Sequence, residues 1–283
     1  MPQIRFVIRL AYAPAFFVGY LWFAVTLAHK GAPLWALPIL LGSALAVSFV
    51  AERLAPYEKA WNRSHGDRGR DLMHAVVNEV SIALSVLALP LVSGLIPNFG
   101  LWPTGWPLWG QLTVAILVAD FGITLAHYVS HRIPALWPLH AVHHSVERMY
   151  GFNGLLKHPL HQAIELAAGT APLVLLGMPQ DVAWLVAFAV AIQLILQHSN
   201  VDMKIGPLAY VWAVAPAHRH HHLASPIDGD VNFGLFTSLW DHLLGTFRSG
   251  SDTPKAGQIG VSGRPDYPRD YLRQLAEPFR RDV

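Results

Sequence analysis

Long apolar runs alternate with short polar stretches along this chain. Four runs, at 10–27, 34–50, 72–96 and 112–126, approach or exceed the length of a membrane-spanning helix, which needs about 20 mostly apolar residues. Two further runs, 163–176 and 182–196, are separated only by Gly-Met-Pro-Gln-Asp and predict a tight helical hairpin. Everything after residue 198 is too polar to cross again. The pattern predicts an all-α integral membrane protein with about six membrane-crossing helices.

The distribution of basic residues predicts the orientation of these helices. The polar stretch at 51–71 carries Arg53, Lys59, Arg63, Arg68 and Arg70, so the positive-inside rule places it in the cytoplasm. Both termini, and the polar stretches that follow the fourth and sixth runs, then lie on the cytoplasmic face, of the inner membrane if the protein is bacterial. The first run could also be read as a signal peptide, but the residues after it form a poor cleavage site, which favours a retained helix.

Composition narrows the classes of function. Charged residues make up only 13% of the 283 positions, against about 25% in soluble domains, and the net charge of +2 gives no nucleic-acid footprint. Cysteine is absent, which excludes disulfides, iron–sulfur clusters and thiolate zinc sites. We expect membrane helices in 1–105, a catalytic domain in 106–250 and a cytoplasmic tail in 251–283. Basic tail residues either meet anionic headgroups or are solvated: Arg264, Arg269, Arg273, Arg280 and Arg281.

Histidines are the candidate chemistry. Thirteen of the 16 lie between residues 120 and 242, and eight form three boxes, with His198 alone between the second and third box. Spacings of three and four place side chains on one helix face, and neutral imidazole is a common metal ligand. Nine histidines are too many for one ion and suit two. The boxes are H-x-x-x-H at His127 and His131, H-x-x-H-H at His140, His143 and His144, and H-x-x-H-H at His218, His221 and His222.

The kind of metal chemistry has three interpretations. An all-nitrogen dinuclear site at a bilayer surface favours redox iron and O₂. A zinc-dependent membrane hydrolase is an alternative, although it needs fewer histidines and a carboxylate base. A metal transporter is a weaker alternative, because transport needs ionisable residues along several spans, and the spans here hold little beyond Glu79 and Asp120.

The residues around the boxes resemble a known family. The segments D-F-G-I-T-L-A-H-Y-V-S-H-R-I-P, K-H-P-L-H-Q-A-I-E, Q-H-S-N-V and W-D-H-L-L-G-T-F, spread over about half the chain, are similar to the fatty acid hydroxylase/sterol desaturase superfamily. The resemblance implies a helical cytoplasmic cap that holds two irons; zinc is a possible occupant after purification. It also implies that O₂ and two electrons are used to hydroxylate or desaturate a lipid that enters from the bilayer. The electron donor is expected to be a separate b-type cytochrome, ferredoxin or reductase.

The resemblance also assigns ligands. It implies that the eight box histidines and His198 bind the metals. His158 matches a His-Pro position of the family, as a ligand or as a partner of one. Three residues later, family members often carry Glu where this chain has His161, which leaves His161 open as a ligand, a partner of a ligand or a surface residue. His220 lies off the ligand face of its box.

Acidic and amide side chains near the boxes are candidates to orient the imidazoles. Asp120 precedes His127 by two helical turns on the same face, and a carboxylate within a span is usually functional. Asp241 and Asn232 are similar candidates. Asp71, His74 and Asn78 share one face at the start of the third run, where they either approach the site or form a plain interfacial helix start, and the second interpretation is favoured.

Overall fold

The computed structural model describes residues 2–225, 227–250 and 254–280, and these residues form helices joined by loops, with no strand among them. Six helices are long: α1 (Pro2–His29), α2 (Ala36–Leu54), α3 (Arg68–Ser93), α4 (Leu108–Arg132), α6 (Pro159–Leu176) and α7 (Gln180–His198). Four are short: α5 (Trp137–His144), α8 (Ala215–His221), α9 (Leu239–Leu244) and α10 (Tyr271–Ala276). The 3₁₀ turns are η1 (Lys59–Asn62), η2 (Gly151–Leu155), η3 (Gly206–Tyr210) and η4 (Glu277–Phe279).

The long helices confirm an all-α integral membrane protein. Within the described ranges, α1, α2, α3, α4 and α7 are each long and apolar enough to cross a bilayer. The sixth expected crossing corresponds to α6, whose 18 residues reach roughly 27 Å. The number of crossings and the side that faces the cytoplasm stay predictions.

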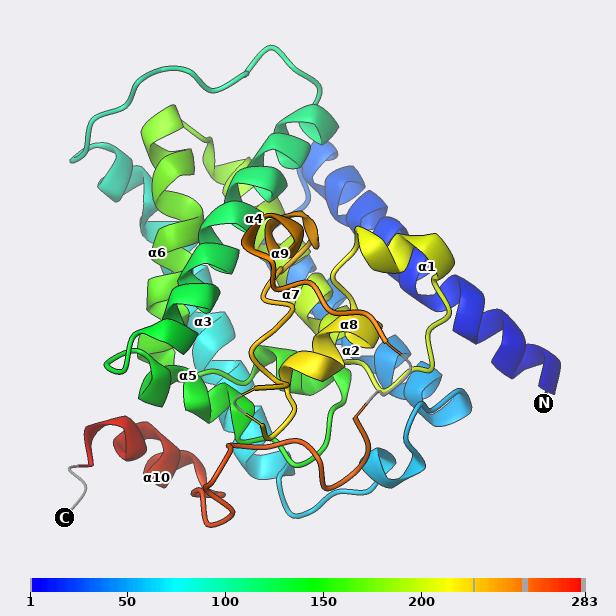
Figure 1. Ribbon diagram of the computed structural model, residues 1–283. Helices are drawn as coiled ribbons and strands as arrows, with labels where there is room; N and C mark the ends of the chain where they lie inside the picture. The colour runs from blue at the N-terminus through cyan, green and yellow to red at the C-terminus, as the bar shows by residue number, and fades with distance from the viewer. Residues whose placement is uncertain (1, 226, 251–253, 281–283) are drawn as a thin grey trace.

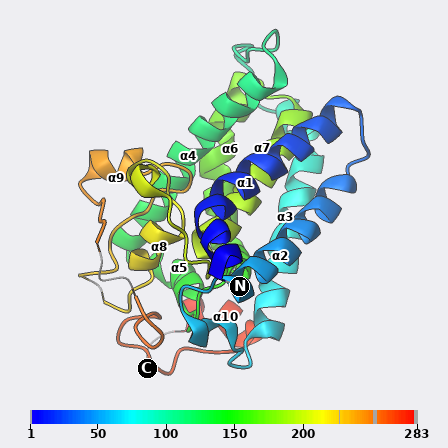
Figure 2. The same ribbon diagram turned by 90° about the vertical axis from the view of Figure 1, so that its right-hand side faces the viewer.

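Helix α7 is the centre of the bundle. It packs against α1, α2, α3 and α4, and most of its side chains are buried. Figure 1 shows α4 and α6 side by side, and Figure 2 shows α8 and α9 on the flank opposite α2 and α3. The contact between α4 and α6 is close because Gly122 lies against the backbone of Ala168, where an added Cβ would come within 2.1 Å of the carbonyl oxygen.

One end of the bundle gathers the histidine-bearing segments. The loop at 55–67, the helices α5 and α8, and the site-side ends of α4 and α7 lie at this end (Figure 1). Buried polar side chains join the segments there. Glu52 of α2 accepts hydrogen bonds from the backbone N–H groups of Gly151 and Asn200, and Arg219 donates to the carbonyls of Ser199 and Val201. These buried hydrogen bonds connect α2, η2, α8 and the loop after α7. They help to bring together three histidine boxes that are far apart in the sequence.

The start of α3 departs from the sequence-based interpretation. Asp71, His74 and Asn78 are buried, so they do not form a plain interfacial helix start. Asp71 accepts a hydrogen bond from the hydroxyl of Tyr150, and Asn78 donates to the carbonyls of Leu155 and Lys157. This helix face fixes the segment that follows the second histidine box. The signal was available in the 3- and 4-residue spacing of the three side chains, which matches a buried face as well as an interface.

The last part of the chain packs against the start of α3 through Gln274, while its basic side chains remain exposed. Gln274 of α10 is fully buried, lies 2.9 Å from Nε2 of His74 and donates to the hydroxyl of Ser145. Four of the five basic tail residues form ion pairs within the chain: Arg264, Arg269, Arg273 and Arg280. Arg281 lies outside the described residues. The segment therefore closes the site end of α3 instead of extending from it.

Candidate metal centre

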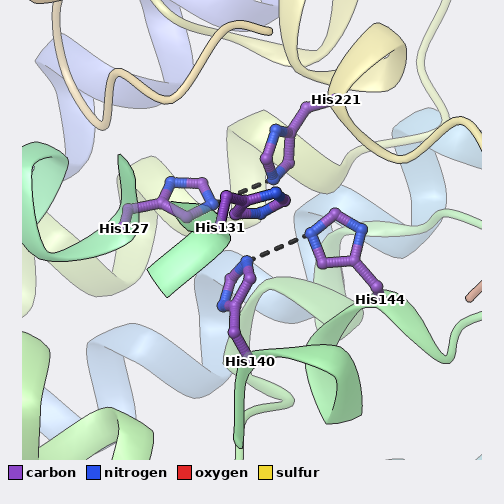
Figure 3. Close-up of side chains that lie close together, drawn as sticks. All are labelled: His127, His131, His140, His144 and His221. Atoms are coloured by element: carbon purple, nitrogen blue, oxygen red, sulfur yellow. Dashed lines mark hydrogen bonds between the residues drawn. The ribbon is translucent and has the colours of Figure 1, made fainter. Parts of the chain in front are cut away.

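Five histidines converge from three elements into one group. Their ligand nitrogens lie within 4.8 Å of one another (Figure 3). The last two turns of α4 carry the first box and α5 carries the second, so helical spacing aims these rings at the same point, and α8 supplies one ring from across the site. We call this set the five-histidine group: His127, His131, His140, His144 and His221.

A second set of four histidines lies beside the first. Its nitrogens also lie within 4.8 Å of one another, and its members come from α5, the end of α7 and α8 with its C-cap. We call it the four-histidine group: His143, His198, His218 and His222. The rings of His144 and His222, one from each group, stack with centroids 4.7 Å apart. The structure thus brings together all nine histidines of the three boxes and His198, in two adjacent sets.

Backbone carbonyls orient four of these rings. Nδ1 of His127 lies 2.9 Å from the carbonyl oxygen of Phe233, and Nδ1 of His221 lies 2.8 Å from that of Val231. In the four-histidine group, His143 and His198 make the same contact with the carbonyls of Leu156 and Leu194 at 2.8 and 2.9 Å. A carbonyl only accepts, so each Nδ1 carries the proton and each Nε2 offers a lone pair.

The lone pairs then face one another. Nε2 of His127 lies 2.9 Å from Nε2 of His221, and Nε2 of His143 lies 3.1 Å from Nε2 of His198. A shared proton would need an imidazolium, but burial lowers the pKa of His221 to about 4, and burial with the nearby His222 and His198 lowers the pKa of His143 well below its usual range. Two neutral acceptors at this distance repel unless a cation lies between them. Each group therefore fits a metal ion, with nitrogen as the only donor atom.

His161 lies at the edge of the five-histidine group. Its ring packs against that of His140 with centroids 4.5 Å apart, its Nε2 lies 3.0 Å from the hydroxyl of Ser130, and its Nδ1 lies 3.7 Å from Glu165. His140, His161 and Glu165 form a third set with ligand atoms within 4.8 Å. The position supports a partner of the metal ligands, and the assignment stays a prediction.

His158 lies outside both groups. It is the N-cap of α6, where its Nδ1 accepts a hydrogen bond from the N–H of Leu160, and its Nε2 lies 3.2 Å from the carbonyl of Leu275. The structure gives it a capping role, with Pro159 at the first helical position, and its role as a ligand or as the partner of a ligand stays a prediction. His220 is buried but belongs to neither group.

Asp120 does not orient an imidazole. Its carboxylate accepts hydrogen bonds from the N–H of Phe236, the hydroxyl of Thr237 and the indole of Trp240. The helical spacing placed Asp120 on the face of His127 correctly, but the loop before α9 lies against Asp120 on that face, two turns from His127. Asp120 therefore fixes this loop to α4.

Asp241 and Asn232 do not contact the imidazoles directly but hold the backbone whose carbonyls orient them. Asp241 accepts hydrogen bonds from the N–H groups of Phe233 and Gly234, and so holds the carbonyl that orients His127. Asn232, with φ of 55°, donates to the carbonyls of Ala217 and Arg248 and lies between the two carbonyl-bearing residues Val231 and Phe233. Such carbonyl partners were missed from the sequence because any residue can supply them.

A groove and a cavity lie beside the metal centre. On one side, a groove borders the five-histidine group at His131, His144 and His221 and includes Asp230, which lies 3.5 Å from Nδ1 of His131. On the other side, an apolar cavity of about 780 Å³, counting its open side, lies between α3, α4, α6 and α7. Its polar end contains Lys157, Gln162 and Glu165, and the ion pair between Lys157 and Glu165 was not foreseen from the sequence.

Comparisons with known proteins identify similar sequences. Residues 112–246 match the family model described as fatty acid hydroxylase. The chain is 34% identical to the ornithine lipid hydroxylase OlsE of Rhizobium tropici over 248 residues, which cover 84% of this chain and 74% of that protein. It is 30% and 28% identical to the alkylglycerol monooxygenases of Danio rerio and Homo sapiens, over 53% and 52% of this chain but only 32% of each of those proteins. No solved structure matches.

Proposed function

The chain belongs to the fatty acid hydroxylase family of membrane oxidoreductases, and from this membership we propose that it is a di-iron monooxygenase that hydroxylates a membrane aminolipid. The observation that carries the metal assignment is the pair of facing Nε2 lone pairs, one in each histidine group. Iron supplies the redox chemistry that activates O₂ with two electrons from a separate donor protein. Zinc has no redox chemistry, so family membership favours iron over the zinc hydrolase, and enzymes over metal transporters.

The protein's own residues would position the ions and the lipid. The carbonyls of Phe233, Val231, Leu156 and Leu194 hold four rings in the tautomer that binds a metal. The cavity would receive an alkyl chain from the bilayer because its lining is mostly apolar. One of its lining residues, Leu194, lies one helical turn before His198 on α7, so the chain would lie near the metal centre. In this orientation, the C–H bonds of the lipid that lie near Lys157 and Glu165 would face the metal centre.

An aminolipid is the first candidate substrate because the sequence similarity to an ornithine lipid hydroxylase covers most of the chain. The match to the ornithine lipid hydroxylase extends over 84% of the chain, whereas the matches to the alkylglycerol monooxygenases cover about half. An amino-acid headgroup also offers charged groups that suit the polar end of the cavity. A glycerol ether lipid is the comparison substrate.

The experiment that tests this function uses the purified full-length protein with iron, a reductant-coupled donor and an ornithine lipid under ¹⁸O₂. We expect one ¹⁸O atom in the lipid product and none from labelled water. Oxygen derived from water, or cleavage of the lipid in place of hydroxylation, would contradict the proposal and favour a hydrolase.

The orientation in the membrane has its own test. We propose that the metal centre and both termini face the cytoplasm, since the basic loop at 55–67 lies at the same end of the bundle as the histidines. A reporter inserted near Pro103, at the opposite end, is expected outside the cytoplasm. A cytoplasmic reporter at Pro103 would overturn this orientation.

A further inference from the structure

A buried ion pair lines the apolar cavity close to the metal centre, because Glu165 belongs to the set formed with His140 and His161. Lys157 and Glu165 form this pair, and their side chains are only 6% and 4% exposed. The cavity itself is apolar along its length, from Leu89 and Met178 at the far end to Leu194 at the near end. On α7 it extends from Ala183 to Leu194, or roughly 16 Å. An ion pair in such a place is costly to bury, and hydrophobic packing would close a cavity at less cost.

The position of the pair connects the cavity to both histidine groups. Glu165 is one turn from His161 on α6 and belongs to the set that includes His140 of the five-histidine group. Lys157 follows Leu156, whose carbonyl orients His143 of the four-histidine group. A lipid in the cavity therefore meets the ion pair just before it meets the metals, with the amide of Gln162 beside it.

We propose that the Lys157–Glu165 pair recognises the headgroup of the substrate and selects lipids that carry one positive and one negative charge. This inference rests on the proposed function and deepens it. A carboxylate of the headgroup would bind Lys157 while its ammonium group binds Glu165, so the four charges alternate and none is left unpaired. An amino-acid headgroup acylated on one of two amines keeps both groups.

The same physics sets the order of selectivity. A lipid with a single net charge adds an uncompensated charge to a buried, electrically neutral site, which is strongly unfavourable. A neutral lipid leaves the ion pair closed and gains nothing from it. The pair thus favours zwitterionic headgroups over neutral ones, and neutral ones over those with one charge, by repelling wrong substrates as well as by attracting the right one.

The test compares four substrates with the full-length protein loaded with iron in lipid nanodiscs. These are an ornithine lipid, its N-acetylated anionic form, its methyl-ester cationic form and a neutral alkylglycerol. For the wild type we expect kcat/KM to be at least about tenfold higher for the ornithine lipid than for either singly charged form, mostly through KM. Iron content is measured alongside.

Single substitutions should invert the preference by charge. In Glu165→Gln the unpaired Lys157 leaves a positive site, so the N-acetylated anionic form becomes the best substrate. In Lys157→Met the unpaired Glu165 leaves a negative site, so the methyl ester becomes the best. A purely structural role for the pair would lower activity on all four substrates alike. Glu79→Gln, a carboxylate on α3 that lines a separate pocket with Trp184, is the matched control and should keep the wild-type order.

The double variant Lys157→Met/Glu165→Gln keeps the test decisive if a single variant does not fold, because it leaves no unpaired buried charge. We expect it to lose the preference for the ornithine lipid over the neutral lipid. An unchanged substrate order in the double variant, or no inversion in folded single variants, would overturn the inference. If the wild type hydroxylates none of the four lipids, the proposed function itself is wrong.

Discussion

The two histidine groups share α5 and α8 but differ in their surroundings. The five-histidine group borders the polar groove, where His131, His144 and His221 form part of the lining. The four-histidine group is enclosed, and each of its residues is at most 3% exposed. It also has one histidine fewer. From this difference we infer two ions with unequal roles. The ion in the five-histidine group could be reached from the aqueous groove, whereas the ion in the four-histidine group would have only four histidines to hold it.

The largest effect on iron content is expected in the four-histidine group, which has no fifth histidine to replace a lost one. We predict that His198→Ala leaves three ligands in the four-histidine group, removes one iron per chain and abolishes turnover. His131→Ala leaves four histidines in the other group, including the facing pair His127 and His221, so it should keep both irons with weaker binding and measurable turnover. Iron content by elemental analysis and lipid hydroxylation give the readout. Equal loss of iron in the two variants would break the distinction between the groups.

The box variants offer a second check of the same size. His143→Ala and His221→Ala each remove one of the facing Nε2 atoms, and with it the contact that fits the ion. We expect both to lose iron and activity while the helices still insert into the membrane. Full iron and activity in either variant would exclude that residue as a ligand.

The histidine pattern and the long helices could be predicted from the sequence because both depend on local periodicity. The boxes follow helical spacing, and the spans follow run length. The partners of the imidazoles could not be predicted, because Phe233, Val231, Leu156 and Leu194 act through their carbonyls and reach the rings only in the folded chain. Asp120 shows the limit well: its helix face was correct, but the loop that covers that face comes from 116 residues further along the chain.

Substitution of a glycine beside α7 should affect one histidine group more than the other, with an effect of intermediate size. Gly154 of η2 lies against α7, and an added Cβ would come within 2.3 Å of the Leu194 carbonyl, which orients His198. We predict that Gly154→Ala destabilises the fold by about 1–3 kcal/mol and releases iron mainly from the four-histidine group. Gly42→Ala, where a Cβ meets no atom within 4 Å, is the control. A variant that keeps two irons and wild-type thermal stability would contradict this contact.

Asp241 should affect the other group. Asp241→Asn removes an acceptor from the N–H groups of Phe233 and Gly234, so the carbonyl that orients His127 shifts. We expect iron affinity of the five-histidine group to fall about 10–100-fold. Asp120→Asn should lower thermal stability but leave iron affinity unchanged, since its hydrogen bonds reach Phe236, Thr237 and Trp240, and none of these residues supplies a carbonyl to an imidazole. Titration of the apo variants with iron distinguishes the two outcomes, and equal iron affinity would refute the indirect role of Asp241.

The smallest effects concern the histidines at the margin. His161→Ala should keep most of the iron but slow turnover about 10–100-fold, and His161→Glu should retain much of the activity. His158→Ala removes a helix cap and should cost about 1 kcal/mol of stability without loss of iron or turnover. Loss of iron in His161→Ala would instead identify His161 as a ligand.

The central claim is that a cation lies between the facing imidazoles of each histidine group. The most direct measurement is the metal content of the wild-type protein, purified in detergent from cells supplied with iron, together with X-ray absorption at the iron edge. We predict two irons per chain with a first shell dominated by nitrogen. One metal per chain, or a shell dominated by oxygen, would contradict it.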